Sequence, residues 1–517
     1  MFAVERSSIV SGHARSIALT GLSTELVEID VQLAQGLPSF SIVGLPDKAV
    51  NESRERVRGA LAAIGISIPP KRIVVNLAPA SLVKEGSHLD LPITLALLVV
   101  IGVLKQPDID DILSMGELSL DGSIRGIPGV IPGALAAVEH YCRFICPAEQ
   151  GGEAACVGDQ IQIAAPASLL ALIQHVRGET RLPQPEPMML DDEQPLPDLI
   201  DVKGQETAKR ALEVAAAGGH NMLIVGPPGS GKSMLAARLP GILPPLQAQE
   251  LLEVSMIKSV AGDQKSSAMS RNRPFRAPHH AASMAAMVGG GIRARPGEVS
   301  LAHHGVLFLD ELPEFGRQVL ESLRQPIEAG TVSVARANVH ATYPARFQLI
   351  AAMNPCRCGH LGDPAMACSR APKCGADYQR KISGPLLDRI DIRIEVPAVA
   401  VSDLALPTPS EDSEEIKLRV ENARYVQRQR FAALGRTDLS TNCQAEGLVL
   451  DQITDLTDRA RKLIETASQR LRLSARGYYR VLRVARTVAD LAGSDMIDRP
   501  HLAEAISYRG GFGLANQ

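Results

Sequence analysis

Two hydrophobic periods divide this chain. From Asp201 to about Pro397, short apolar segments end in polar or glycine-rich residues, which is the pattern of strands alternating with helices. From Ser413 onward the pattern is helical, and residues 480–491 place Val481, Val484 and Val488 on one face and arginines on another. The sequence therefore predicts an α/β protein with a helical C-terminal part.

The longest apolar run extends from Leu91 to Leu104. It is too short to cross the ~30 Å of a bilayer core, so it predicts a buried helix. A basic start followed by an apolar run, as in a secretory signal, does not open the sequence. We expect a cytoplasmic protein without a membrane partner.

A proline-rich, acidic segment over residues 179–200 precedes both patterns. Such segments favour extended, solvated conformations, so this one is predicted to be a linker. It separates an N-terminal domain over 1–178 from an α/β core over 201–400. A helical region over 401–517 completes the predicted organisation.

Composition narrows the choice of partners. The chain has 54 Lys and Arg against 57 Asp and Glu, a net charge of −3, which excludes a globally basic nucleic-acid coat but not a local basic surface. Aromatic residues make up only 3% of the chain, and Trp is absent. Stacking on nucleic-acid bases would therefore have few platforms.

A glycine-rich motif lies between the apolar segment 221–225 and a helical pattern. In a P-loop of this kind, backbone N–H groups surround phosphate oxygens, the lysine supplies a positive charge and the following hydroxyl binds Mg²⁺. The motif predicts ATP and Mg²⁺ as cofactors, and a chance glycine turn is the alternative. The predicted phosphate-binding residues are Gly226, Pro227, Pro228, Gly229, Ser230, Gly231, Lys232 and Ser233.

Two further apolar segments end in polar residues that suit phosphoryl transfer. Asp310 and Glu311 follow the first, and Asn354 ends the second. Asp310 is predicted to hold Mg²⁺ with Ser233, and Glu311 to polarise the attacking water. Asn354 is a candidate for orienting that water. Ordinary solvated strand ends are the alternative in both places.

Four cysteines lie close together in the sequence directly after Asn354. They are Cys356, Cys358, Cys368 and Cys374. Four thiolates can bind Zn²⁺ tetrahedrally and order a small loop, and His360 is a possible substitute ligand. Iron also binds thiolates. Reduced, partly buried thiols are the alternative to a metal site.

Residues 201–510 resemble a AAA+ ATPase of the magnesium-chelatase-like group, which is also similar to the MCM helicases. The quoted matches are the P-loop, Gly305 to Glu311, Asn354, Leu386 to Asp391 and Ser474 to Arg476. This resemblance implies an adjoining helical lid. It also implies a homo-oligomer, a hexameric ring.

The resemblance assigns three roles in this sequence. It implies that Asn354 is the sensor-1 residue, Arg389 the arginine finger that reaches the neighbour's ATP, and Arg476 the sensor-2 residue of the lid. A guanidinium offers fixed donors to a phosphoryl group that develops charge. From the residues alone, a local ion pair of Arg389 with Asp388 or Asp391 is the alternative.

The N-terminal region carries a second resemblance. Met115 to Gly129 is similar to a stretch of the Lon protease domain, and Lys84 to Gly86 to the approach to its nucleophile. The catalytic serine and lysine would fall near His88 and Ile131, and Ile131 can accept no proton. Ser87 is one position away. The prediction is a Lon-like, S5-type α/β domain without peptidase dyad, retained for binding or assembly.

Together with the segment Arg273 to His280, these features resemble the ComM/YifB family over nearly the whole chain. The resemblance implies a DNA helicase that promotes branch migration during homologous recombination in natural transformation, with single-stranded or branched DNA as partner. A protein or metal-insertion remodeller of the magnesium-chelatase type is the alternative. The missing dyad opposes a third function, ATP-dependent proteolysis.

Candidate DNA contacts lie in two basic segments. Arg276, His279 and His280 belong to the first, between the two nucleotide motifs, and residues 331–343 form a predicted hairpin with Arg336 and Asn338 near its tip. Arginines on loops can bind phosphates without reading sequence. We predict DNA contacts for Arg336 and Arg276. Solvated surface or subunit ion pairs are the alternative.

Overall fold

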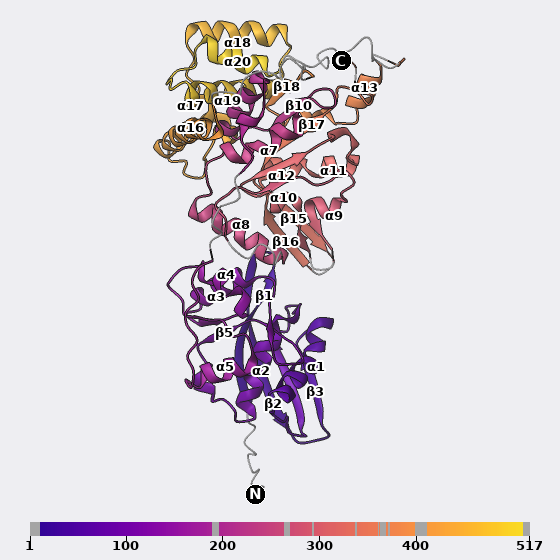
Figure 1. Cartoon of the computed structure of the whole chain (residues 1–517), viewed down its shortest axis with the longest axis vertical. Coiled ribbons are helices and arrows are strands. Elements are labelled where there is room, and N and C mark those ends of the chain that lie inside the picture. Colours follow the sequence, from indigo (N-terminus) through magenta and orange to yellow (C-terminus); the bar gives the residue numbers. More distant parts are fainter. Residues whose placement is uncertain are drawn as a thin grey trace.

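The computed structural model describes residues 11–188, 196–262, 269–291, 294–336, 339–359, 361, 369–370, 373–398 and 411–509. The molecule is elongated (Figure 1), with the N-terminal strands at one end and the C-terminal helices at the other. A parallel sheet lies between them. No helix in these ranges combines the length and the apolar character needed to cross a membrane.

A seven-stranded sheet of order β3-β4-β2-β1-β5-β8-β9 forms the N-terminal part. β1 and β2 pair antiparallel, as do β2 and β4, whereas the other neighbours are parallel. The strands are β1 (Ser11–Thr20), β2 (Ser23–Ala34), β3 (Ser39–Val43), β4 (Arg72–Ala78), β5 (Ile112–Ser114), β8 (Arg143–Ile145) and β9 (Ile163–Ala164). A short hairpin joins β6 (Glu117–Leu118) to β7 (Ile124–Arg125), and the helices are α1 (Lys48–Ala63), α2 (Asp90–Val100), α3 (Val130–Glu139), α4 (Gly151–Ala155) and α5 (Leu169–Val176).

Helix α2 confirms the buried helix predicted from the longest apolar run, although it ends at Val100 rather than Leu104. Its first residue, Asp90, is fully buried and accepts two hydrogen bonds from the Arg56 guanidinium and one from the Leu118 N–H. A buried carboxylate is tolerated because it is paired in this way. The polar end of α2 thus anchors the helix against α1 and β6.

The central sheet has five strands in the order β11-β14-β17-β10-β18, and all neighbouring pairs are parallel. Its strands are β11 (Phe275–Arg276), β14 (Val306–Leu309), β17 (Gln348–Met353), β10 (Met222–Val225) and β18 (Ile392–Glu395). The surrounding helices are α6 (Glu206–Gly218), α7 (Lys232–Ile242), α8 (Ala248–Ala261), α9 (Met284–Val288), α10 (Glu298–Leu301), α11 (Arg317–Ser322), α12 (Arg324–Ala329), α13 (Lys373–Gln379) and α14 (Gly384–Leu387). The predicted hairpin is confirmed as β15 (Thr331–Arg336) and β16 (Val339–Pro344), and a smaller one pairs β12 (Gly289–Gly290) with β13 (Arg295–Pro296).

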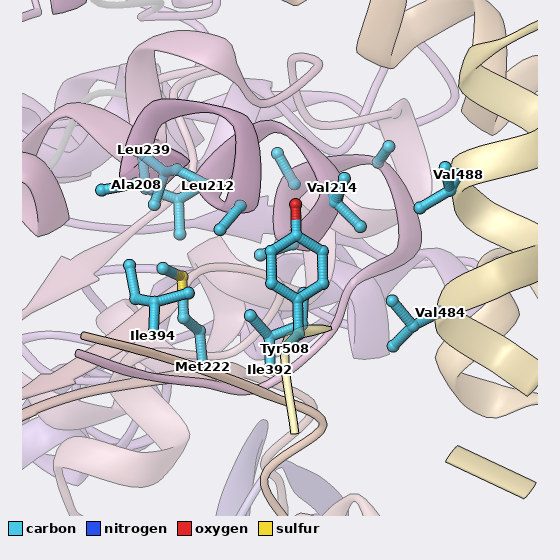
Figure 2. Close-up of a cluster of buried hydrophobic side chains, with 14 of the residues drawn as sticks. Ala208, Leu212, Val214, Met222, Leu239, Ile392, Ile394, Val484, Val488 and Tyr508 are labelled. Carbon is cyan, nitrogen blue, oxygen red and sulfur yellow. The ribbon is translucent and has the colours of Figure 1, made fainter. Parts of the chain in front are cut away.

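The C-terminal helices share a hydrophobic core with this sheet. They are α16 (Ser413–Ala433), α17 (Gly447–Ile453), α18 (Asp458–Arg470), α19 (Ala475–Leu491) and α20 (Arg499–Ser507). Figure 2 shows Val484 and Val488 of α19 facing the same core as Met222 and Ile392 of the sheet. The predicted apolar face of α19 is therefore confirmed, but its arginines are not all exposed. Arg486 is buried, paired with Asp490 and bonded to the carbonyls of residues 494 and 495.

The proline-rich segment is less solvated than predicted. Residues 179–188 contain no helix or strand, yet Gln184 accepts a hydrogen bond from the Ile163 N–H (2.8 Å), and the Met188 N–H donates to the Gly152 carbonyl (3.1 Å). Prolines prevent regular pairing but leave carbonyls and side chains able to bond. This part of the segment runs along the N-terminal sheet.

Helix α8 joins the N-terminal and central parts. The Gly129 N–H donates to the Ser259 carbonyl of α8 (3.0 Å), and Ile131 of α3 packs in an apolar cluster with Leu251 and Val254. At the position where the Lon resemblance would require a base, Ile131 therefore packs in the interface between the N-terminal and central parts.

Candidate functional site

Three neighbouring strands deliver polar residues to one edge of the central sheet. The P-loop follows β10, Asp310 follows β14, and Asn354 follows β17. In open α/β sheets, ligands bind at the carboxyl ends of the strands. The glycines make the loop possible, since Gly229 and Gly231 have φ values of +75° and +82°, a region that other residues avoid.

Lys232 begins α7 and is buried at this edge. Its ammonium donates to the carbonyls of Gly226 (2.9 Å) and Pro227 (2.8 Å) and to Asn354 Oδ1 (3.1 Å). Burial lowers the pKa of Lys232, while the charges of Asp310 and Glu311 act in the opposite direction. The lysine that suits phosphate and the asparagine of the neighbouring strand are thus in direct contact.

Ser233 and Asp310 also meet, with the Ser233 hydroxyl 2.5 Å from Asp310 Oδ2. A hydroxyl and a carboxylate are ligands that Mg²⁺ accepts, usually with several waters. The pair therefore fits an Mg²⁺ ion bound together with nucleotide phosphates.

Glu311 has a left-handed backbone, with φ of +51°, and its side chain is about half exposed. His280 lies beside it, with Nδ1 3.5 Å from Glu311 Oε2. Non-glycine residues in this conformation are uncommon and concentrate at functional sites. His280 was a candidate for DNA contact, and the structure places it beside the acidic pair.

Arg389 is buried at the opposite edge of the sheet, three residues before β18 begins. It forms an ion pair with Glu328 and donates to the Pro385 carbonyl at 2.5 Å. The local partner is therefore neither Asp388 nor Asp391, which the sequence suggested. Asp391 instead bonds Arg480 (3.0 Å) and His220 (3.2 Å).

Arg389 and Arg476 line one cavity of about 800 Å³ between the sheet and the C-terminal helices. Acidic groups such as Glu328 also reach it, but none of its lining residues belongs to the P-loop. The structure thus brings Arg389 and Arg476 together and separates both from Lys232. The other arginines that line this arginine cavity are Arg273, Arg346, Arg424, Arg480 and Arg483.

Three of the four clustered cysteines lie together. The Sγ atoms of Cys356 and Cys358 are 3.1 Å apart, and with Cys374 all three lie within 4.8 Å of one another. Cys368 and His360 fall outside the described residues. Three convergent thiols fit a thiophilic ion such as Zn²⁺.

A second cluster, which sequence reasoning missed, joins Glu253 of α8 to His303 and His304. Glu253 Oε2 lies 3.0 Å from His303 Nε2 and 2.8 Å from His304 Nε2. Its pKa is lowered to about 2, first by the His303 hydrogen bond. His303 Nδ1 accepts the Arg346 N–H (2.9 Å), so Nε2 carries the proton and offers a metal no lone pair. This cluster is a hydrogen-bonded clamp. Its only sequence signal was a His pair directly before β14.

The predicted DNA contacts have mixed surroundings. Arg276 forms a bidentate ion pair with Glu298, at 2.7 and 2.8 Å. Arg336 ends β15 at the hairpin, but its side chain and Asn338 lie outside what the structure describes. The neighbouring Arg273 is buried and bound to Glu250.

The N-terminal positions of the Lon resemblance are each engaged elsewhere. His88 is buried, with Nε2 2.8 Å from the Ile17 carbonyl, and the Ser87 hydroxyl donates to the Glu117 carboxylate. Lys84 is also buried and donates to the Pro79 carbonyl, and burial lowers its pKa. None of these hydrogen bonds joins a hydroxyl to an amine.

A parallel sheet with a P-loop and an acidic pair at its carboxyl edge, followed by packed helices, is consistent with a AAA+ nucleotide-binding protein. Three family models match: "Magnesium chelatase, subunit ChlI" over residues 198–404, "Subunit ChlI of Mg-chelatase" over 27–150, and "Magnesium chelatase, subunit ChlI C-terminal" over 410–509. Together they cover most of the chain.

Whole-chain similarity is more specific. The chain is 42% identical over 500 residues to competence protein ComM of Haemophilus influenzae, covering 96% of each chain, and 42% identical over 498 residues to protein YifB of Escherichia coli, with the same coverage. The maternal DNA replication licensing factor mcm6 of Xenopus tropicalis is 24% identical over 224 residues, 40% of this chain and 25% of that protein. The chain belongs to the ComM/YifB family of magnesium-chelatase-like AAA+ proteins.

Proposed function

We propose that this protein is a AAA+ ATPase that hydrolyses MgATP in a homo-oligomer, a hexameric ring, and uses the energy to move on DNA. The observation that carries the proposal is the contact of Lys232 with Asn354 beside that of Ser233 with Asp310. Phosphoryl transfer depends on positioning and charge neutralisation, which these groups supply.

In the proposed mechanism, Lys232 and the P-loop N–H groups hold the phosphates, and Ser233 and Asp310 hold Mg²⁺. Bound Mg²⁺ neutralises charge on the phosphates. Glu311 polarises the attacking water, and Asn354 orients it. The Glu311→Gln variant should bind ATP and assemble but turn it over at least about a hundredfold more slowly. Normal turnover in that variant would remove Glu311 from its role.

Arg389 and Arg476 are proposed to act on the ATP of a neighbouring subunit. Their shared cavity, which no P-loop residue lines, supports this arrangement. In an isolated chain Arg389 is neutralised by Glu328. Assembly would bring the neighbour's γ-phosphate to the arginine in place of that carboxylate.

We propose single-stranded or branched DNA as the partner, and branch migration during homologous recombination in natural transformation as the role. The similarity to a protein named for competence and to one named for DNA replication licensing supports this, as does the hairpin that carries Arg336. Arg276 would reach phosphate only if its pair with Glu298 opened. We propose the cytoplasm as the site of action.

ATP hydrolysis measured with and without single-stranded and three-stranded branched DNA, across a salt series, tests the DNA role. Stimulation that fades with salt is expected, because phosphate contacts release counterions. ATPase activity indifferent to DNA would refute the motor. It would favour the second candidate, a protein or metal-insertion remodeller, which the magnesium-chelatase family models support.

The remaining assignments are also proposals. We divide the chain into a Lon-like, S5-type domain over 1–178, a linker over 179–200, an ATPase core over 201–400 and a sensor-2 lid over 401–517. The N-terminal domain would serve binding or assembly, since His88 is hydrogen bonded to the Ile17 carbonyl and Ile131 packs against α8. The close approach of Cys356, Cys358 and Cys374 supports bound Zn²⁺.

A further inference from the structure

The cysteine cluster lies at the junction of two segments that flank the nucleotide site. Cys356 and Cys358 belong to the turn that follows β17, and Cys374 is the second residue of α13. Cys356 is completely buried and Cys374 nearly so. A metal ion bound by these three thiolates would therefore cross-link the turn to the helix.

The turn contacts the P-loop directly. It is closed by a hydrogen bond from the Gly359 N–H to the Cys356 carbonyl (3.0 Å), and Gly359 has φ of +84°. A Cβ atom at Gly359 would lie only 2.5 Å from Pro228 Cδ. The backbone of the cysteine turn thus packs against the P-loop with no spare room.

The same turn also fixes the position of Asn354. This residue lies two positions before Cys356, and its Oδ1 accepts a hydrogen bond from the Lys232 ammonium. The next residue, Pro355, accepts a hydrogen bond through its carbonyl from Gln379 of α13 (3.2 Å). Movement of Cys356 relative to α13 would therefore displace both Asn354 and Pro228.

Helix α13 reaches the acidic side of the site. Tyr378, one turn after Cys374, is hydrogen bonded to Glu314, and burial raises its pKa to about 12. Lys381 lies 3.3 Å from the Glu314 carboxylate. The Glu314 N–H donates to the Glu311 carbonyl (2.8 Å), so this contact continues to the residue proposed to polarise water.

We infer that Cys356, Cys358 and Cys374 form a regulatory metal site, in which a thiophilic divalent cation, Zn²⁺, holds the P-loop and Asn354 in the geometry needed for hydrolysis. The inference rests on the proposed ATPase function. Metal binding contributes folding energy to small loops that lack a core of their own. Loss of the ion releases the turn, so the chain still binds ATP but hydrolyses it slowly.

Metal content and catalysis are measured on the full-length protein. Thiol modification of the wild-type protein should release about one Zn²⁺ per chain, detected with a chromogenic chelator. Cys358→Ser should lose the ion. Its kcat should fall about tenfold, because residues that only orient catalytic groups contribute effects of this size. The Kd for ATP should change less than about threefold. The matched control is Cys156→Ser, which removes a half-buried thiol outside the cluster.

Chelator-stripped wild-type protein provides the same comparison without a substitution, and added Zn²⁺ should restore kcat. Circular dichroism identifies any variant that has unfolded. Absence of bound Zn²⁺ from protein purified without chelators and then supplied with the ion would overturn the metal site. Full hydrolysis by folded, metal-free protein would overturn the regulation. A metal-loaded wild type without ATPase activity would instead refute the proposed function.

The route through Pro228 has its own variant. Gly359→Ala should retain Zn²⁺ but reduce ATP turnover about tenfold, because the added methyl group displaces the P-loop. Gly435→Ala is the control, since Gly435 also has a positive φ, +71°, but an added Cβ there would meet no atom within 4 Å. Equal turnover in the two variants would overturn this route.

Discussion

The edge of the central sheet that carries the P-loop (the P-loop edge) and the arginine cavity lie in the same AAA+ module. They differ in whether the residues of one chain already contact one another there. At the edge, Lys232 meets Asn354 and Ser233 meets Asp310, so cation, hydroxyl and acid come from one chain and already contact one another. In the cavity, Arg389 and Arg476 face about 800 Å³ of space that no P-loop residue lines. Under the proposed function, one chain suffices to bind nucleotide, whereas hydrolysis needs a second chain.

The ion pair of Arg389 with Glu328 is a second difference between the arginine cavity and the P-loop edge. A buried guanidinium without a partner is costly, and Glu328 supplies the neutralising charge in the isolated chain. A γ-phosphate from a neighbour would have to replace that carboxylate. Under the proposed function, the Arg389–Glu328 ion pair holds the guanidinium in position until the neighbour's phosphate binds.

The largest effect is expected at the P-loop edge. Lys232→Ala should weaken ATP binding at least about a hundredfold, because a buried ammonium that bonds phosphate is lost. Binding is measured with a fluorescent ATP analogue. Lys417→Ala, which removes an exposed ion pair with Glu414, should bind normally. Tight ATP binding by Lys232→Ala would contradict the assignment of nucleotide binding to the P-loop edge.

Arg389→Ala should separate binding from hydrolysis. Arginine fingers contribute about 10³-fold or more to turnover, so kcat should fall by that order while ATP affinity is retained. Glu328→Gln is the matched control, since it breaks the same ion pair but leaves the arginine. If Glu328→Gln loses as much activity as Arg389→Ala, the ion pair is structural and the finger role fails.

Arg476→Ala should have a smaller effect, about tenfold on turnover, because Arg476 shares the cavity with six other arginines. Steady-state hydrolysis at saturating ATP measures it. Arg470→Ala, at the exposed end of α18, serves as control because Arg470 does not line the cavity. Unchanged ATP turnover in Arg476→Ala would show that Arg476 has no role in hydrolysis and would leave Arg389 as the proposed catalytic arginine of the cavity.

The smallest effect concerns the clamp that holds His304 in the cavity wall. The pKa of Glu253 is lowered from 4.5 to about 2, so its stabilising contribution is complete above pH 4.5 and is lost as the pH falls towards 2. Glu253→Gln should lower the free energy of unfolding at pH 7 by about 1 kcal/mol, after allowance for its partial exposure.

Urea unfolding at a series of pH values between 7 and 3 measures this clamp. The difference between Glu253→Gln and wild type should shrink below pH 4.5. Gln249→Ala, which removes an exposed contact to the same carboxylate, should change stability little at any pH. A difference that stays constant with pH would exclude the Glu253 charge as its source.

The contrast between the P-loop edge and the arginine cavity also explains which parts of the site the sequence could predict. The P-loop is contiguous, and the hydrophobic strands before Asp310 and Asn354 indicated that their polar ends share one edge. The pairing of Arg389 with Glu328 was not predictable, because 61 positions separate the partners and no local pattern joins them. Nearer acids, Asp388 and Asp391, were the reasonable candidates.

The burial of charged side chains was also not predictable from the sequence. Periodicity placed the apolar face of α19 correctly and its arginines on another face. It did not show that Arg486 is buried, where Asp490 and two carbonyls satisfy its guanidinium. Glu253 and the His303–His304 pair likewise meet only in three dimensions. Hydrophobic patterns predict where helices pack, but they do not predict which polar groups are buried as partners.

Mixed oligomers test the central claim most directly. Lys232→Ala lacks the phosphate-binding ammonium, and Arg389→Ala lacks the arginine, so each should be nearly inactive alone. If the arginine acts on the neighbour's ATP, mixing the two purified variants should give hydrolysis well above the sum of the separate rates, because some interfaces combine an intact P-loop with an intact Arg389. A mixture no more active than the sum of its parts, in assemblies shown to exchange subunits, would contradict catalysis between chains.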